Sequence, residues 1–418
     1  MAEPEFHLFV GVDWATEEHQ ACVLNPQGEV VAEREVPHSG RAVGDFLKWL
    51  LSLAKCLPAS IAVAIEIPHG ALVETLVERG LAAFSINPKQ LDRFRDRYYP
   101  AGAKDDRRDA FVLANSLRTD PHCFRPIQLD DPLVLRLRDL SRLDDELCTS
   151  FNRHSCQLRE QLFRYYPQLL RLSPSANEPW LWDLLELAPT PQHARRLRPT
   201  RIEKLLRARR IRRRQPSEVV QELRAPGFQL ADGTAEAASE HALLLLPHLR
   251  LIHQQRAELA TRMKEILDQF GAAPADDSNE NQHRDVEIIL SLPGVGRVVA
   301  ATMLAEASQA LAQRDYHALR SYGGTAPITR RSGKKIIVVM RRACNRRLRD
   351  AFYHWARVSV QYDPVSYEQY HLLRSFGHSH GRALRGVSDR LLNVLCAMLR
   401  HGTLYDAERR QAPVVVAA

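Results

Sequence analysis

The order of strand-like and helix-like segments in the first 86 residues most constrains the fold. Three short apolar or alternating runs come first, and an Asn-Pro-Gln-Gly turn at residues 25–28 separates the second from the third. No Gly-x-Gly-x-x-Gly follows the first run, which counts against a dinucleotide-binding domain. The predicted elements are strands at 6–12, 20–24 and 30–36, a helix at 42–53, a strand at 61–65, a helix at 71–79 and a strand at 81–86.

This order, in which a meander precedes the crossovers, is that of the ribonuclease H-like fold, so we expect an α/β domain over residues 1–128. The chain has 418 residues, more than one hydrophobic core usually serves, so further units should follow. The expected fold class is α/β plus all-α. A helical coiled-coil region with a basic insert and a linker is expected at 129–285, and a helical C-terminal domain at 286–410.

Two stripes of apolar residues with helical spacing define the middle region. The first runs from Leu140 to Tyr165 and the second from Leu249 to Phe270, in steps of three or four residues. They predict either an antiparallel helix pair or an oligomerising coiled coil. The polar segment at 271–285 lacks periodicity and is interpreted as a linker.

The composition favours a cytoplasmic protein. No apolar run approaches the roughly 20 residues of a membrane helix, and no secretory signal is recognisable, so no membrane association is expected. The seven cysteines are scattered without a Cys-x-x-Cys motif, which fits free thiols better than disulfides or a zinc site.

Positive charge is concentrated in two short segments. Residues 195–214 carry eleven Lys or Arg and one Glu, and residues 330–349 carry nine Lys or Arg and no acid. The net charge of the chain is +8, so the two segments with +10 and +9 leave −11 for the other 378 residues. Such local excess predicts two places where polyanions bind, although either segment alone could be a solvated face.

Acidic side chains stand where a catalytic site of an RNase H-like domain would lie. Asp13 ends the first predicted strand and Glu66 the fourth, and these strands are neighbours in that fold. Asp105, Asp106 and Asp109 open a helical stretch, with spacings that place Asp109 on one face with either partner. Converging carboxylates with few His or Cys select Mg²⁺ or Mn²⁺. Taken singly, each could be a turn residue or a helix-terminal charge.

Three motifs, GVDWATEEHQACVLNPQGEVV, AIEIPHG and KDDRRDA, resemble the acidic motifs of the insertion-sequence-110 family of DEDD transposases. The resemblance implies a RuvC-like catalytic domain whose four carboxylates are Asp13, Glu66, Asp106 and Asp109. It makes Asp105 a bystander, in a position where the common family form has Thr; the residues alone leave Asp105 and Asp106 equivalent.

The C-terminal region contains two further motifs. LPGVG at 292–296 is typical of a helix-hairpin-helix, in which Gly294 and Gly296 would let the backbone approach a phosphate; a plain turn between packed helices is the alternative. Within 321–356, Gly-x-Ala-Pro-x-Thr-x-x-Ser-Gly-Lys followed by Arg-x-x-x-Asn-x-Arg-Leu-Arg is similar to the signature of the same family's transposase domain. That resemblance implies that Ser332 is a nucleophile joined covalently to DNA.

The prediction is therefore a transposase that cleaves and rejoins DNA through a phosphoserine intermediate, with Mg²⁺ or Mn²⁺ as cofactor. The resemblance further implies an element-encoded guide RNA, double-stranded DNA at element ends and target, and a dimer that pairs into a tetramer. The alternatives are a metal-dependent junction nuclease that uses water, and a non-catalytic DNA-binding protein. The predicted nucleic-acid contacts are Gly294, Gly296, Arg207, Arg209, Arg210, Arg212, Arg213, Arg214, Arg330, Arg331, Lys334, Lys335, Arg341, Arg342, Arg346 and Arg347.

Two further pairs of residues have a structural interpretation rather than a functional one. His378 and His380 form a His-x-His without an acidic or Cys partner at useful spacing, so a polar turn is the better interpretation. Trp180 and Trp182 lie in an apolar helical stretch and are expected to be core residues rather than base-stacking platforms.

Overall fold

A computed structural model describes residues 6–54, 57–98, 105–128, 130–231, 233–272, 280–333 and 335–411. The chain divides into two compact units, one ending at Asp130 and the other beginning at Asp131. Among the helices of these described ranges, none is long and apolar enough to cross a membrane.

The N-terminal unit is built on a six-stranded mixed sheet with the order β3-β2-β1-β4-β5-β6. β1 pairs in parallel with β4, and β4 in parallel with β5, while the outer pairings are antiparallel. The predicted ribonuclease H-like meander and crossovers are confirmed; the short β6 was not predicted. The strands are β1 (Leu8–Asp13), β2 (Glu18–Leu24), β3 (Val30–Pro37), β4 (Ile61–Ile65), β5 (Ala82–Ser85) and β6 (Arg125–Pro126).

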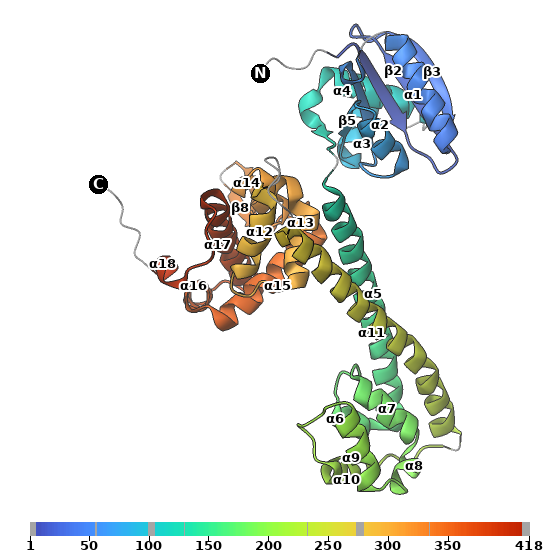
Figure 1. Cartoon of the computed structure of the whole chain (residues 1–418), viewed down its shortest axis with the longest axis vertical. Helices are drawn as coiled ribbons and strands as arrows, with labels where there is room; N and C mark the ends of the chain where they lie inside the picture. Colours follow the sequence, from blue (N-terminus) through green and yellow to red (C-terminus); the bar gives the residue numbers. More distant parts are fainter. Residues whose placement is uncertain are drawn as a thin grey trace. The chain divides into compact units, whose positions relative to one another are not determined.

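Helices cover both faces of this sheet (Figure 1). α1 (Gly40–Ala54) and α2 (Ala71–Glu78) pack their apolar faces against one side, where Phe46 and Leu76 are fully buried. α3 (Pro88–Tyr98) and α4 (Asp106–Thr119) cover the other side. β4 is buried along its whole length because helices lie on both of its faces, as expected for a central parallel strand.

Gly11 in β1 sets how closely α4 approaches the sheet. A Cβ at this position would lie 1.9 Å from the Ala110 carbonyl oxygen and 2.5 Å from the Ala114 nitrogen. Only glycine therefore lets the two backbones meet, and this close packing brings the first turn of α4 beside the end of β1. The position of the candidate carboxylates depends on this contact.

Replacing Gly11 with Ala is expected to destabilise the N-terminal unit by about 3 kcal/mol or more, because backbone atoms cannot yield as a flexible side chain can. Urea denaturation monitored by circular dichroism measures this. Gly44→Ala in α1 is the matched control, because no atom lies within 4 Å of the added Cβ, and it should be neutral or slightly stabilising. Equal stability of the two variants would contradict the proposed close contact.

The second unit contains two long helices that pack against each other, α5 (Pro132–Tyr165) and α11 (Thr234–Ala272) (Figure 1). They run antiparallel, since the start of α5 packs with the end of α11 around Leu137 and Ile266, and the end of α5 packs with the start of α11 around Leu158 and Leu246. Of the two predictions for the middle region, the antiparallel pair within one chain is thus the arrangement observed.

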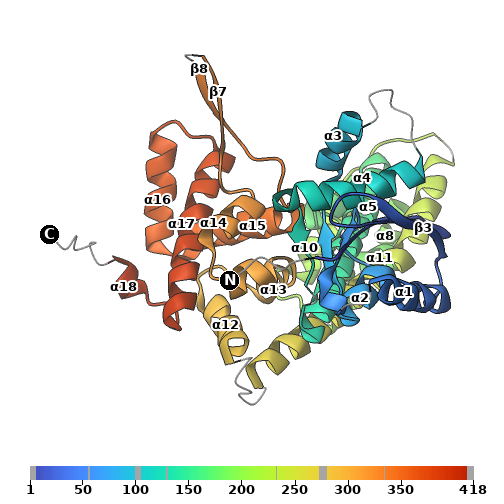
Figure 2. The same ribbon diagram turned by 90° about the horizontal axis from the view of Figure 1, so that it is seen from above.

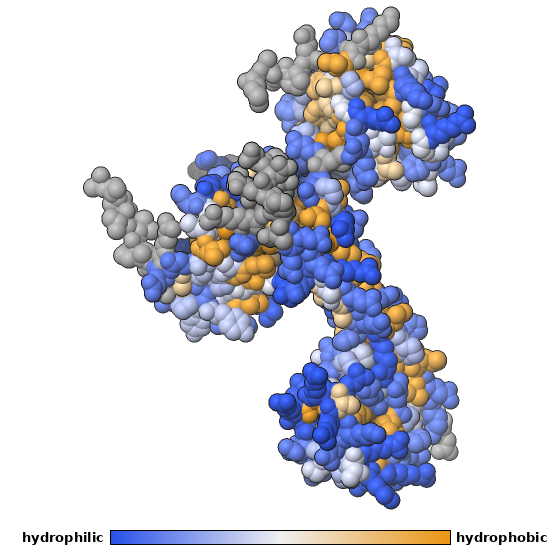
Figure 3. Space-filling view, viewed as in Figure 1, coloured by the Kyte–Doolittle hydropathy of each residue, from blue (hydrophilic) through white to orange (hydrophobic). Residues whose placement is uncertain are grey.

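Between these helices the chain forms a small helical insert, which shares one buried core with the end of α5 and the start of α11. Its helices are α6 (Pro167–Leu172), α7 (Pro179–Leu187), α8 (Pro191–Arg195), α9 (Pro199–Ala208) and α10 (Pro216–Leu223). Trp180 and Trp182 are buried in this core, as predicted. Hydrophilic side chains predominate over this insert in the space-filling view (Figure 3).

The C-terminal helices pack around one buried core together with the start of α5 and the end of α11. They are α12 (Glu280–Ser291), α13 (Arg297–Ala312), α14 (Tyr316–Tyr322), α15 (Arg346–Tyr362), α16 (Pro364–Ser375) and α17 (His380–His401), and the short α18 (Ala407–Gln411) follows them in the chain. The linker prediction for 271–285 is wrong where it can be judged, because 271–272 end α11 and 280–285 begin α12; residues 273–279 lie outside the described residues.

A two-stranded hairpin interrupts these helices and was not predicted. β7 (Ile328–Ser332) and β8 (Lys335–Val339) pair antiparallel and project from the helices around them (Figure 2). Nearly all of their residues are exposed, although β8 is apolar.

Candidate functional site

The sheet register brings Asp13 and Glu66 side by side. Val12 pairs with Ile65 in the parallel β1–β4 ladder. Asp13 is the next residue and the last of β1, and Glu66 directly follows the end of β4. Because side chains alternate between the faces of a sheet, the two acids share one edge and one face. The predicted neighbour relation of these two carboxylates is therefore present.

The charges of α4 act on Asp13. The pKa of Asp13 is raised to about 6, first by burial and then by the negative charges of Asp109 and Asp106, with a smaller contribution from Glu66. Arg95 opposes this shift. The charges of the other three predicted carboxylates thus act on Asp13.

Asp105 has a separate role at the start of α4. Its side chain is the N-cap and accepts a hydrogen bond from the Arg107 backbone N–H at 3.2 Å. It is half exposed, and it is absent from the charges that shift the pKa of Asp13. Asp106 and Asp109, in contrast, lie in the first helical turn.

Arg95 of α3, which sequence reasoning did not identify, lies among these acids. Its Nε donates to Asp109 Oδ1 at 2.7 Å, and its two terminal nitrogens lie 3.7 Å from Glu66 Oε2 and 2.7 Å from Asp92 Oδ1. One guanidinium therefore joins three carboxylates. No sequence signal distinguishes Arg95 from Arg93 and Arg97 beside it.

The donor set fits a hard divalent cation. All of the candidate ligands are carboxylates, and Asp109 is only 3% exposed, with its Oδ2 buried and without a hydrogen-bond partner. Within the described residues, no three His, Cys, Asp or Glu side chains are arranged closely enough to hold a metal ion as they stand. Arg95 supplies the local positive charge in this arrangement.

Ser332 ends β7, where it pairs with Lys335 across the hairpin turn. Gly333 adopts φ +56°, in the left-handed region that this turn requires. Lys334, a predicted nucleic-acid contact, lies outside the described residues. The serine is thus presented at the end of an exposed hairpin.

The hairpin has two chemically different faces. Arg330 and Ile337 lie on the face of Ser332 and Lys335, because paired residues and alternate residues share a face. The other face carries Arg331 with Ile336 and Val338, which are 58% and 55% exposed. In the described part of the chain, neither Arg330 nor Arg331 has an ion-pair partner, so both cations remain free to contact a phosphate.

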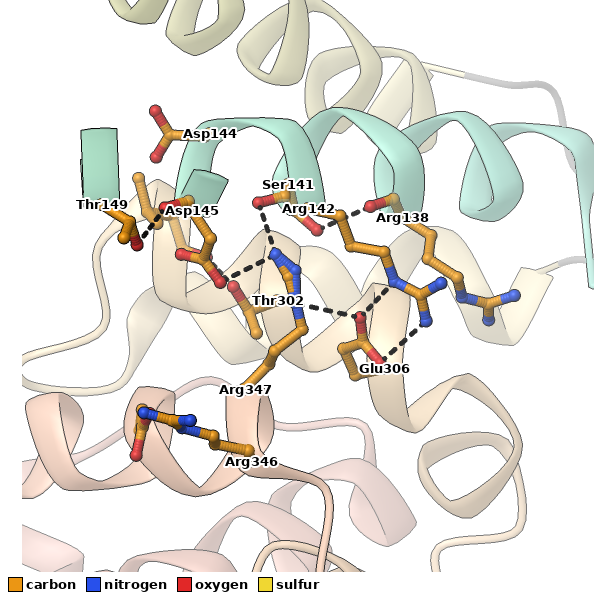
Figure 4. A network of polar contacts seen from close by, with 12 residues as sticks. Arg138, Ser141, Arg142, Asp144, Asp145, Thr149, Thr302, Glu306, Arg346 and Arg347 are labelled. Carbon is orange, nitrogen blue, oxygen red and sulfur yellow. Dashed lines mark hydrogen bonds and ion pairs between the residues drawn. The ribbon is translucent and has the colours of Figure 1, made fainter. Parts of the chain in front are cut away.

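Arg347, another predicted nucleic-acid contact, is instead used inside the protein (Figure 4). It contacts Asp145 of α5 at 2.8 Å and Glu306 of α13 at 3.8 Å. Glu306 is almost fully buried and also accepts hydrogen bonds from Arg142 and Asn345. This network joins α5, α13 and α15, so the role of Arg347 in the structure is to hold these helices together.

The other basic residues of this segment differ in availability. Arg342 and Arg346 are exposed, and Arg346 lies 3.9 Å from Asp350. Arg341 is partly buried and donates a long hydrogen bond of 3.4 Å to the Ala326 carbonyl.

The two glycines of the LPGVG turn also differ. Gly294 has φ +79°, and a Cβ there would lie 2.6 Å from the Ser359 nitrogen and 3.0 Å from the Trp355 carbonyl oxygen. It serves close packing of the turn on α15. Gly296, the N-cap of α13, has open space around it and can still admit a phosphate.

The first basic segment contains both paired and unpaired arginines. Arg209 binds Asp183, Arg213 binds Glu178, and Arg214 donates to the Leu172 carbonyl at 2.8 Å. Arg207, Arg210 and Arg212 are exposed and, within the described residues, have no ion-pair partner. Three of the six predicted contacts are therefore engaged in the fold of the insert.

The His-x-His pair shows no metal geometry. His380 shares a hydrogen bond with the Tyr370 hydroxyl at 2.8 Å, and the His378 carbonyl accepts one from Arg374 at 3.0 Å. The polar-turn interpretation fits these contacts.

Comparison with known proteins identifies the class. Residues 10–167 match a family of transposases with a DEDD domain, and residues 286–371 match the transposases of the IS116/IS110/IS902 family. The chain therefore belongs to the IS110/IS116/IS902 family of insertion-sequence transposases, enzymes that transfer DNA strands.

Individual relatives extend over the whole chain. A putative transposase for the mini-circle IS117 of Streptomyces coelicolor is 32% identical over 100% of both chains. An IS110 protein of the same organism, described as uncharacterised, is 29% identical over 98% of both. The putative transposase y4uE of Sinorhizobium fredii is 47% identical over 50% of this chain, which spans 58% of that protein.

Proposed function

We propose that this transposase cuts and rejoins DNA through a covalent bond between Ser332 and a DNA phosphate. The serine Oγ attacks phosphorus, a P–O bond of the strand breaks, and the departing strand leaves as a hydroxyl that takes up the serine proton. A hydroxyl of the incoming strand then attacks the phosphoserine and restores the diester. No net hydrolysis occurs, so the bond energy is conserved.

The observation that carries this proposal is the presentation of Ser332. It lies at the exposed end of a hairpin, on one face with Arg330 and Lys335 and without a competing acid on either strand. Guanidinium and ammonium groups there can bind the scissile phosphate and stabilise charge in the transition state.

We propose Asp13, Glu66, Asp106 and Asp109 as ligands of Mg²⁺ or Mn²⁺. When bound, the ion would supply Lewis-acid chemistry to phosphate oxygens. The N-cap function of Asp105 favours Asp106 as the fourth ligand. The chain's own contribution is to hold these acids close together through the β1–β4 register and the contact at Gly11.

We further propose double-stranded DNA at element ends and target as substrate, in the bacterial cytoplasm. A structured guide RNA and a dimer pairing into a tetramer belong to the same proposal; they rest on the family resemblance and on the exposed charge near 195–214. The domain limits 1–128, 129–285 and 286–410 are proposed on the same basis.

A denaturing gel tests the serine chemistry. Labelled substrate DNA incubated with wild-type protein and Mg²⁺ should migrate with the protein after denaturation. If cleaved DNA appears but never attached to protein, a water-using junction nuclease is the correct function. If no DNA is cleaved under conditions that support transposition in cells, a non-catalytic binding role is favoured.

Arg95→Gln should tighten binding of Mn²⁺ several-fold, because Arg95 neutralises the same carboxylates that the ion must bind. Isothermal titration of the full chain measures the affinity. Arg97→Gln is the matched control on the same helix, since the ion pair of Arg97 is with Asp120, at 3.7 Å, and its guanidinium lies over the Tyr98 ring, away from the candidate ligands. Weaker binding in Arg95→Gln would show that Arg95 supports the metal site rather than competing with the ion.

Replacing Arg207, Arg210 and Arg212 together with Gln should weaken nucleic-acid binding and reduce the slope of log K against log salt by about 2–3, because each lost phosphate contact removes about 0.9. Fluorescence anisotropy at several salt concentrations measures it. Arg209→Gln should leave the slope unchanged, because Arg209 is held by Asp183. An unchanged slope in the triple variant would rule out this surface as a nucleic-acid contact.

A further inference from the structure

A cleft beside the β7–β8 hairpin collects arginines that have no acidic partner. It has a volume of about 300 Å³ and is bordered by the end of the hairpin, including Val338 and Met340, and by the beginning of α17. Arg341, Arg382 and Arg385 all line it. Among the described residues, none of these three guanidinium groups forms an ion pair.

The single carboxylate on the wall of the cleft is already neutralised. Asp389 accepts two hydrogen bonds from Arg320, at 2.9 and 2.7 Å, and a third from the Thr325 hydroxyl at 3.3 Å. A bidentate pair of this kind leaves little negative charge for other cations. The cleft is therefore strongly positive.

Arg385 is in an unfavourable environment as the protein stands. It is partly buried, and burial together with the neighbouring charge of Arg382 lowers its pKa. Arg382 also lies in the first turn of α17, where the helix dipole disfavours cations. An anion in the cleft would relieve all three penalties at once.

We propose that this cleft binds a backbone phosphate of the DNA strand that Ser332 cleaves, a few nucleotides from the scissile position. A planar guanidinium group can donate two hydrogen bonds to two oxygens of one phosphate. This geometry matches a phosphodiester better than the single point charge of a lysine ammonium group does. The proposal rests on the proposed function of Ser332, because that function places DNA on the hairpin.

The hairpin also sets the spacing. Val339, at the edge of the cleft, pairs with Ile328, four residues along β7 from Ser332. Four residues of extended strand span roughly 13 Å, which equals about four base-pair rises of a duplex. The bound phosphate would thus fix the register of the strand on the hairpin without reading its sequence.

The test compares Arg382→Gln/Arg385→Gln with Arg390→Gln, an exposed arginine of α17 that does not line the cleft. A 40-base-pair duplex containing an element end is titrated with each full-length variant at several salt concentrations. Because one phosphate contact is lost, the double variant should lower the salt slope by about 1, and Arg390→Gln should not change it. Thermal unfolding checks that each variant is folded.

A second arm locates the phosphate. Neutral methylphosphonates placed singly along the strand should weaken wild-type binding most at about four base pairs from the cleavage position, and that weakening should disappear in the double variant. The proposal is overturned if the salt slope and the position profile of the double variant equal those of the wild type. It is also overturned if the two substitutions affect only the binding of single-stranded RNA, or if they change the oligomeric state of the DNA-free protein. If wild-type protein forms no adduct at Ser332 but the Arg382→Gln/Arg385→Gln variant still lowers the salt slope, the serine chemistry is refuted and phosphate binding in the cleft stands.

Discussion

Ser332→Ala should abolish the covalent protein–DNA species and reduce strand transfer on the order of 10³-fold or more, because it removes the hydroxyl on which the proposed phosphoester forms. Binding of uncleaved DNA should be nearly unchanged, since Arg330 and Lys335 remain on the same face of the hairpin. Strand transfer is measured with labelled element ends and target duplex, and binding by anisotropy.

Thr329→Ala is the matched control for this substitution. Thr329 lies on the same strand, is also exposed, and points to the opposite face. It should retain strand transfer near the wild-type rate. If Ser332→Ala cleaves as fast as Thr329→Ala, the serine is only a turn residue and water is the nucleophile.

Asp109→Asn should lower the affinity for Mn²⁺ by at least about tenfold and stop DNA cleavage. Asp109 is buried in the first turn of α4, and the change keeps its shape while removing the charge that a divalent ion requires. Titration calorimetry gives the affinity independently of activity.

Asp105→Asn is the corresponding control, because Asn is as good an N-cap as Asp and should preserve the start of α4. It should bind Mn²⁺ as wild type does. If Asp105→Asn and Asp109→Asn lose the metal equally, the assignment of the four ligands is wrong.

Local sequence patterns were sufficient to predict the N-terminal domain. Apolar strands and a meander without a glycine-rich loop predict that β1 and β4 are neighbours in the sheet. This pairing alone brings Asp13 beside Glu66. The residues alone left Asp105 and Asp106 equivalent, and the capping contact that distinguishes them depends on where α4 begins. The contribution of Arg95 could not be predicted, since it arises from packing of α3 against residues distant in sequence.

For the basic residues of the C-terminal region, local sequence patterns were not sufficient to predict their ion-pair partners. Sequence gives their number, but not which ones the fold itself neutralises. Arg347 is drawn into the Glu306 network because α5, some 200 residues earlier in the chain, packs against α13 and α15. The hairpin was missed because β8 is an apolar run too short to distinguish a strand from a helix, and it stays exposed instead of joining the core.

The most direct test of the account is to identify the atom joined to DNA. After reaction with Mg²⁺, the protein–DNA species is digested with nuclease and protease and the modified peptide is fragmented by mass spectrometry. We expect a nucleotide on the Ser332 hydroxyl and none in the Ser332→Ala protein. A nucleotide on any other residue, or unmodified Ser332 in a preparation that has completed strand transfer, would contradict the central claim.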